Sequence, residues 1–206
     1  MSHSLQDFAA EDSETGTGLA LRDDQGRYLF ILAGTRHRCP PGELFYAGIG
    51  GHREHGEDWL ACARREAQEE IGAPIKIESA RATWHMPVGR PMQRLDLLDQ
   101  PRPLALYDMI HPPHTPRAGG IYHIVVYEAR LLQPPKNLPP DELLGVLALS
   151  RDQVIKGKSR KPRLGTLLEE GAEVVVSCKE ISRDTRLYPI GTALALSQLL
   201  EIIGDH

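Results

Sequence analysis

Residues 51–73 combine a glycine turn, a helical pattern and a fixed set of charges, and they constrain the fold more than any other segment. Apolar residues recur there at three- and four-residue spacing, which predicts the buried stripe of an amphipathic helix. This stripe consists of Leu60, Ala63, Ala67 and Ile71. Gly72 follows the last apolar position, as expected of a left-handed C-terminal cap, and therefore marks the end of the helix.

Three glutamates of this predicted helix lie on one face. Glu66, Glu69 and Glu70 are spaced i, i+3 and i+4, so their side chains are one turn apart. Like charges at this spacing repel, and the helix gains stability from them only if a cation lies between them. Carboxylate oxygens select a hard divalent cation, Mg²⁺ or Mn²⁺, rather than zinc. The segment therefore predicts a metal site.

A solvated acidic helix face is the alternative explanation, because such faces are common on surface helices. The register of the surrounding residues argues against it, since two glycines, a further glutamate and an arginine also stand at fixed spacing. These residues are Gly51, Glu57, Arg65 and Gly72. The glycine-rich run 48–51 also lets the backbone pass close to a bulky group, and it offers its carbonyls as further ligands.

With these positions, the segment resembles the Nudix box, the signature of hydrolases that act on a nucleoside diphosphate linked to another moiety. Every fixed charged and glycine position of that pattern is present in residues 51–73. Ala67 and Ala73 occupy its two aliphatic positions, and both are small for them. The chain departs from the family pattern at one position before the box. Many family members have proline before the double glycine, whereas this chain has Ile49.

The resemblance implies roles for particular residues of this chain. The implied metal ligands are the carbonyl of Gly50 and the carboxylates of Glu66, Glu69 and Glu70. Arg65 and Glu57 are implied to pair with each other and to orient these ligands. Outside the box, related enzymes take another ligand or the general base from a late acidic loop, and we predict that Glu142 has that role here. An ordinary helix start is the alternative for Glu142.

The function implied by the resemblance is that of a Mg²⁺-dependent pyrophosphohydrolase. Its substrate would be a small nucleoside diphosphate derivative of the ADP-ribose, NADH or coenzyme A type. Two other classes remain as alternatives: a non-catalytic Nudix-like regulator that binds nucleotides, and an enzyme similar to prenyl diphosphate isomerases. The regulator would usually lose box glutamates. The isomerase would need a reactive cysteine, and neither Cys39 nor Cys62 has a recognisable context for that role.

Composition narrows the partners and the compartment. The net charge of −4 makes broad nucleic-acid affinity unexpected, and there is no apolar run near 18 residues. Three scattered cysteines form neither a disulfide framework nor zinc-ligand spacing. We therefore expect a cytoplasmic protein that contacts neither membrane nor nucleic acid. Relatives of this length are often dimers, so a homodimer is expected as well.

The order of the predicted elements indicates one domain. Residues 1–16 are predicted to be a mobile acidic tail, and residues 17–206 a single domain. The periodicities predict a hairpin of residues 18–21 and 28–33, strands at 44–49 and 122–129, extended chain at 75–84, a strand and helix within 147–155, and helices at 164–170 and 191–203. Interleaved strands and helices favour a mixed β-sheet between helices. The resemblance sharpens this to an α/β/α sandwich with the metal site at one end of the sheet.

Residues 87–120 hold seven prolines and are predicted to be a long irregular insertion. Long loops in compact domains are commonly functional, so we predict that this insertion covers the nucleotide while the box holds the diphosphate. Residues 34–47 are the alternative location for recognition. Four histidines in or near the insertion match no metal-ligand spacing and are interpreted as loop or edge residues. They are His85, His111, His114 and His123.

Overall fold

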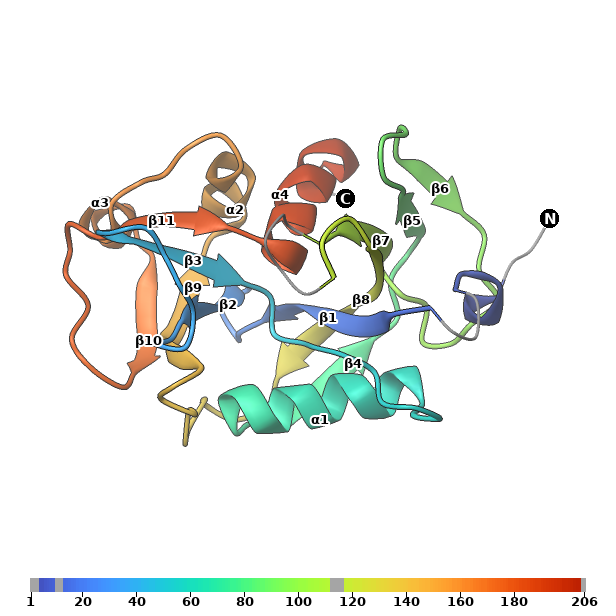
Figure 1. Cartoon of the computed structure of the whole chain (residues 1–206), viewed down its shortest axis with the longest axis horizontal. Coiled ribbons are helices and arrows are strands. Elements are labelled where there is room, and N and C mark those ends of the chain that lie inside the picture. The colour runs from blue at the N-terminus through green and yellow to red at the C-terminus, as the bar shows by residue number, and fades with distance from the viewer. Residues whose placement is uncertain (1–3, 10–12, 112–116, 205–206) are drawn as a thin grey trace.

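The structure, a computed structural model, describes residues 4–9, 13–111 and 117–204. A mixed β-sheet lies between helices, with α1 on one face and α4 and α2 on the other (Figure 1). The helices are η1 (Leu5–Asp7, a 3-10 turn), α1 (Trp59–Ile71), α2 (Arg151–Gly157), α3 (Leu164–Glu169) and α4 (Gly191–Ile203). This arrangement confirms the predicted α/β/α sandwich.

The sheet is built around a long central pair of parallel strands. The strands are β1 (Thr15–Arg22), β2 (Tyr28–Ala33), β3 (Glu43–Ala47), β4 (Ile75–Glu78), β5 (Thr83–Met86), β6 (Gln93–Leu95), β7 (Ala105–Ile110), β8 (Ile121–Leu131), β9 (Leu143–Leu149), β10 (Glu173–Ser177) and β11 (Arg186–Pro189). Their order is β10-β9-β2-β1-β8-β7-β5-β6, with β3 and β11 attached at β2 and β4 attached at β8. β1 and β8 pair in parallel register from Thr15 opposite His123 to Arg22 opposite Arg130.

Successive residues of the central strands pack into two separate cores. Leu19 and Leu21 of β1 join the core under α1, where Ala67 is fully buried. Ala20, between them, joins the core under α4 with Leu196. This alternation follows from the two-residue period of a strand, and it explains why β1 and β8 are apolar on both faces.

Helix α1 is capped at both ends, and its C-terminal end agrees with the sequence prediction. The Asp58 carboxylate accepts hydrogen bonds from the backbone N–H groups of Leu60 and Ala61, at 2.9 and 3.2 Å. Asp58 is therefore the N-cap, one of the residue types that best satisfy free N–H groups at a helix start. At the other end Gly72 adopts φ 58°, the left-handed conformation of a C-terminal cap.

The prediction for residues 87–120 is wrong in part, because two strands lie inside this segment. β6 pairs with β5, and β7 pairs with β8 along its whole length. The distribution of prolines explains the difference. Pro101 and Pro103 precede β7, and the next prolines, at 112, 113 and 116, follow it and lie outside the described residues. The strand itself contains no proline and keeps all its backbone donors.

The described part of the predicted acidic tail is packed against the domain. Leu5 is 5% exposed and belongs to the core on the α1 side of the sheet. β1 begins at Thr15, two residues before the predicted boundary. The prediction of a mobile tail is wrong for this part, because Leu5 and Phe8 are apolar and pack against the core. Strands β10 and β11 were also not predicted. Among the described residues, no helix is long and apolar enough to cross a membrane.

The cap of α1 yields a stability prediction. A β-carbon at Gly72 would lie 2.1 Å from the carbonyl oxygen of Lys136, whereas one at Gly26, which has φ 79°, would meet nothing within 4 Å. Gly26→Ala should cost about 1–2 kcal/mol through its left-handed conformation alone. Gly72→Ala should cost clearly more, because the Lys136 carbonyl must also move. Urea unfolding followed by circular dichroism measures both losses. Equal losses would show that the Lys136 contact is unimportant.

Candidate active site

The loop before α1 is fixed against the first strand. Backbone N–H groups of Thr17 and Leu19 donate to the carbonyls of Gly51 and Ile49, at 3.0 and 2.9 Å. The glycine at position 51 is required by close approach, because a β-carbon there would lie 2.6 Å from Oε1 of Glu66. The turn is thus held between β1 on one side and a carboxylate of the box helix on the other.

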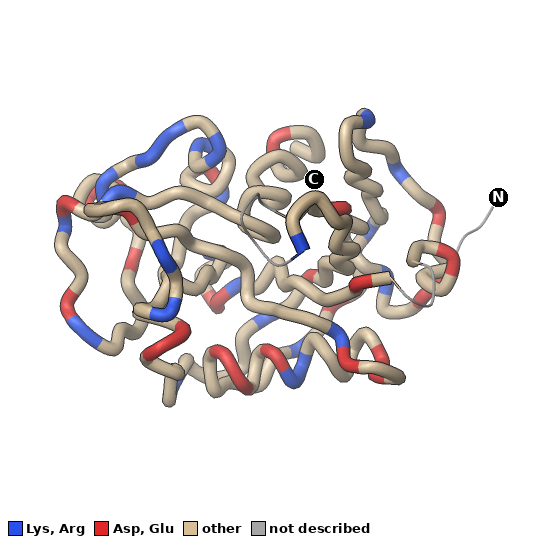
Figure 2. The backbone as a smooth tube through the Cα atoms, viewed as in Figure 1, with Lys and Arg blue, Asp and Glu red and all other residues tan. Residues whose placement is uncertain are grey.

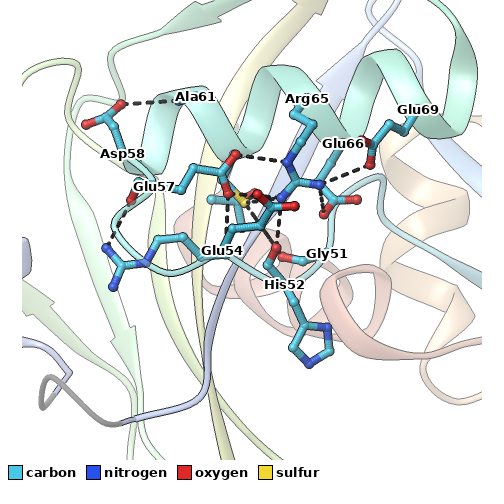
Figure 3. A network of polar contacts seen from close by, with 12 residues as sticks. Gly51, His52, Glu54, Glu57, Asp58, Ala61, Arg65, Glu66 and Glu69 are labelled. Carbon is cyan, nitrogen blue, oxygen red and sulfur yellow. Dashed lines mark hydrogen bonds and ion pairs between the residues drawn. The ribbon is translucent and has the colours of Figure 1, made fainter.

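Arg65 joins this loop to the helix (Figure 3). Its Nε and Nη2 donate to the two carboxylate oxygens of Glu57 at 2.9 and 3.0 Å, a bidentate pair. Nη1 donates to Glu66 at 2.8 Å and to Glu69 at 3.0 Å, and Nη2 also reaches the carbonyl of His52 at 2.9 Å. Hydrogen bonds from Arg65 lower the pKa of Glu57 to about 2, so Glu57 is a permanent anion at neutral pH.

Glu70 lies in a different environment from the other box glutamates. The N–H of Gly50 donates to its Oε2 at 2.9 Å, and no cation contacts it among the described residues. Burial raises the pKa of Glu70 to about 8, and the charges of Glu66 and Glu142 add to the rise. Burial also raises the pKa of Glu66, opposed by Arg65. An enclosed carboxylate beside other carboxylates is costly unless a cation neutralises it.

A cavity of about 780 Å³ opens beside Glu70. Its walls come from β2, β3, β7, β8 and the first turn of α4, and most are apolar or aromatic. Glu70 and Glu142 both contribute carboxylates to this lining, and the N–H of Gly50, which also lines the cavity, donates to Glu70. Side chains in the rest of the lining include Ile31, Phe45, Tyr107, Met109, Ile110, Tyr122, Ile124, Leu143 and Leu194.

The structure divides the predicted site residues into two groups. Glu57, Arg65, Glu66 and Glu69 form one ion-pair network, whereas Glu70 and Glu142 line the cavity. Across the part of the chain that the structure describes, no three His, Cys, Asp or Glu side chains converge as a metal centre. The carboxylates of Glu66 and Glu69 accept hydrogen bonds from Arg65 instead of converging with Glu70.

The donor set nevertheless fits a divalent cation. Glu70 has one neutral hydrogen-bond donor and no positive partner among the described residues, while Glu66 and Glu142 are close enough to raise its pKa. Glu66 is one helical turn away, on the same side of α1. Carboxylate oxygens without a compensating charge are the donors that Mg²⁺ and Mn²⁺ prefer.

Several cavity residues were not identified individually from the sequence. Arg36 and Phe45 belong to the loop range expected to recognise substrate, and Tyr107 and Met109 belong to the insertion, but nothing in the sequence distinguished them. Tyr122 also lines the cavity, where its ring stacks on His52 with centroids 4.6 Å apart. Only the pairing of strands that are distant in sequence reveals which side chains face the cavity.

The histidines divide into two pairings with carboxylates and do not form one cluster. His85 and His123 lie 3.3 and 2.8 Å from Asp108. His111 lies 2.8 Å from Glu14, which also pairs with His52. His111 follows β7 in a loop, as interpreted. His85 and His123 lie in β5 and β8, which pair with other strands on both sides, so their interpretation as loop or edge residues is wrong. His114 lies outside the described residues.

Comparison with known proteins identifies the family. A family model of the NUDIX domain matches residues 13–168. No curated protein matches the chain. Similar solved structures include a NUDIX hydrolase from Nitrosomonas europaea, with 16% identity over 64% of this chain and 66% of that one and a TM-score of 0.40. A MutT NUDIX hydrolase from Burkholderia pseudomallei has 23% identity over 68% and 85% and a TM-score of 0.45.

An Ap4A hydrolase from C. elegans, in a binary complex, is similar over 69% of this chain and 84% of that one, with 17% identity and a TM-score of 0.44.

The family match covers most of the chain and defines the protein as a hydrolase that acts on pyrophosphate bonds. The chain belongs to the Nudix family. Members of this family generally use a divalent metal and act on small nucleotide derivatives.

The Arg65 network leads to a kinetic prediction. Lysine retains the charge but cannot form the planar bidentate contact with Glu57 while also reaching Glu66. Arg65→Lys should therefore lower kcat by roughly tenfold or more with little change in KM, because the carboxylates lose their orientation. The neighbouring Arg64→Lys, at an exposed position of α1, is the control. A rise in KM alone would show instead that Arg65 binds substrate phosphate.

Proposed function

We propose that the protein is a Mg²⁺- or Mn²⁺-dependent pyrophosphohydrolase that cleaves the diphosphate bond of a nucleoside diphosphate linked to another moiety. One observation carries this proposal: the uncompensated Glu70 carboxylate lies beside Glu142 in the lining of a cavity large enough for a nucleotide. The Glu70 carboxylate would help to bind the cation, and the cation would bind the diphosphate. The aromatic and aliphatic walls account for a base or other apolar group.

The box would hold the cation through the Glu66, Glu69 and Glu70 carboxylates and the Gly50 carbonyl. Such an ion, when bound, neutralises phosphate oxygens and lowers the pKa of a coordinated water. Glu66 and Glu69 must then share their charge between the ion and Arg65. Arg65 retains its bidentate contact with Glu57, so it can limit the movement of both ligands.

Glu142 is our candidate for the general base. It lines the cavity with Glu70, and its side chain is 47% exposed, so it remains accessible to water. In this proposal it accepts a proton while the water oxygen bonds to phosphorus, and the other phosphate departs with the electrons of the broken P–O bond. The surrounding chain positions these groups and excludes bulk water on the apolar side of the cavity.

The two alternative functions are less well supported. Every box glutamate is present, which disfavours a non-catalytic regulator. An isomerase would need a reactive thiol, but burial raises the pKa of Cys62 to about 11 and keeps this thiol protonated. Cys39 lies in the loop after β2 and does not line the cavity.

We also propose that the substrate is a small molecule and that the enzyme acts in the cytoplasm as a homodimer. The cavity and the net charge of −4 support a small-molecule ligand over nucleic acid. Light scattering coupled to gel filtration tests the oligomeric state.

The substrate is tested with ADP-ribose, NADH, coenzyme A, dinucleoside polyphosphates and nucleoside triphosphates, each with Mg²⁺, by identifying the products by mass. Release of no product from any of them would overturn the proposed activity.

The role of Glu70 predicts a large loss on neutralisation. Glu70→Gln removes one anionic oxygen from the proposed cation site and should lower kcat by about 10²-fold or more. Circular dichroism should show an intact fold, and calorimetry should show weaker Mg²⁺ binding. Glu180→Gln, an exposed substitution outside the cavity, is the matched control. Near-normal turnover of Glu70→Gln at saturating Mg²⁺ would contradict the assignment.

The insertion contributes to the cavity through β7, which gives a second kinetic prediction. Met109→Ala should raise KM several-fold by removing apolar contact area, and it should leave Mg²⁺ binding unchanged. Met92→Ala is a control in the same insertion, because Met92 does not line this cavity. If both variants keep the KM and the substrate ranking of the native enzyme, recognition lies outside the insertion. Point substitutions are preferable to deletion here, since deletion would remove β7 from the sheet.

A further inference from the structure

Arg36 is the one lysine or arginine side chain among the described residues that line the cavity. The lining already contains two carboxylates, Glu70 and Glu142, and a diphosphate would add further negative charge. A divalent cation at the box can neutralise only part of this charge. Arg36 is therefore the available fixed cation of the protein for the substrate, and the roles proposed above do not use it.

The backbone determines where this arginine lies. The N–H of Gly34 donates to the carbonyl of Glu142, and the N–H of Arg36 donates to the carbonyl of Asp141, both at 2.8 Å. A β-carbon at Gly34 would lie 2.3 Å from the carbonyl carbon of Glu142, so the two loops are in direct contact. Arg36 is consequently held beside Glu142 by backbone pairing and not by side-chain contacts alone.

In the structure the guanidinium of Arg36 pairs with the carboxylate of Glu142. The side chains are 69% and 47% exposed, so water screens their attraction and the pair exchanges readily. A phosphate group competes well for such a guanidinium, because its oxygens accept two parallel hydrogen bonds. The same pair also occupies the carboxylate that the proposed reaction needs as a base.

We propose that Arg36 binds the diphosphate of the substrate and that its transfer from Glu142 to phosphate frees Glu142 to accept the proton of the attacking water. This inference rests on the proposed function, which supplies the diphosphate substrate and the base. In the transfer, the Arg36–Glu142 ion pair breaks and an Arg36–phosphate pair forms, with no change in covalent bonding. Hydrolysis then forms a bond from the water oxygen to phosphorus and breaks the P–O bridge, and the water proton moves to Glu142.

The exchange couples binding to activation. Without a diphosphate the Glu142 carboxylate stays paired, and with one it is released next to the bond to be cleaved. A ligand that fills the apolar walls but lacks a phosphate near Arg36 would leave the pair intact. Arg36 would therefore help the enzyme to select diphosphates among compounds of similar shape.

The test compares Arg36→Ala and Arg36→Lys with Arg38→Ala, a control in the same loop at a position that does not line the cavity. ADP is the binding probe, titrated calorimetrically in EDTA so that neither a metal ion nor turnover contributes. Loss of a charged hydrogen-bond pair should raise the Kd for ADP by about 10–100-fold in Arg36→Ala. Arg36→Lys should show a smaller rise, and Arg38→Ala should stay within about twofold of native.

Kinetics with the best substrate of the panel form the second part of the test. Arg36→Ala should raise KM by a similar factor while kcat stays within about threefold of native, because Glu142 is then free from the outset. Glu142→Gln should lower kcat whether Arg36 is present or not. Unchanged ADP binding and unchanged KM in Arg36→Ala would overturn the role of Arg36 and leave the proposed hydrolysis standing. Failure of the native enzyme on every substrate would overturn the hydrolysis, whereas the ADP titration would still report on Arg36.

Discussion

The bidentate contact between Arg65 and Glu57 is the interaction on which the geometry of the site depends. It joins the helix face that carries the acidic residues to the loop that precedes the helix, and Arg65 also contacts Glu66 and Glu69. The four carboxylates of this loop and helix would otherwise repel one another. The single charge of Arg65 is shared among three of them, and Glu70 is left without a positive partner among the described residues. That imbalance is the physical basis for proposing a cation.

The two cores of the sandwich give the site a rigid support. The sheet carries one apolar face to α1 and the other to α4, so β1 is buried on both sides between them. The glycine loop pairs along β1, and the cavity beside it is walled by β2, β3, β7, β8 and the first turn of α4. The central part of β1 carries no charged residue and is drawn entirely in tan in Figure 2. Binding groups placed on such strands hold their positions better than groups on free loops.

Sequence periodicity predicted the regular elements better than the segments between them. The stripe of α1, its glycine cap and the closing helix α4 all agree with the structure, because each depends on neighbours three or four residues away. The insertion and the acidic tail were interpreted from composition, which averages over residues. Such an average does not reveal the proline-free strand β7 within the insertion or the apolar residues Leu5 and Phe8 within the tail. Strands β10 and β11 are short, and their pairing with β9 and β3 stabilises them.

By itself, the sequence determined the box helix, the shared face of its glutamates and the family, because these depend on spacing within 23 consecutive residues. Only the tertiary structure decided which of those glutamates are paired with Arg65 and which one faces the cavity. It also brought Arg36 to Glu142, residues 106 positions apart, and β7 to the cavity wall. Contacts of this kind arise from strand pairing and loop packing between distant segments. Local spacing carries no information about them, since the burial of the whole sheet selects the partners.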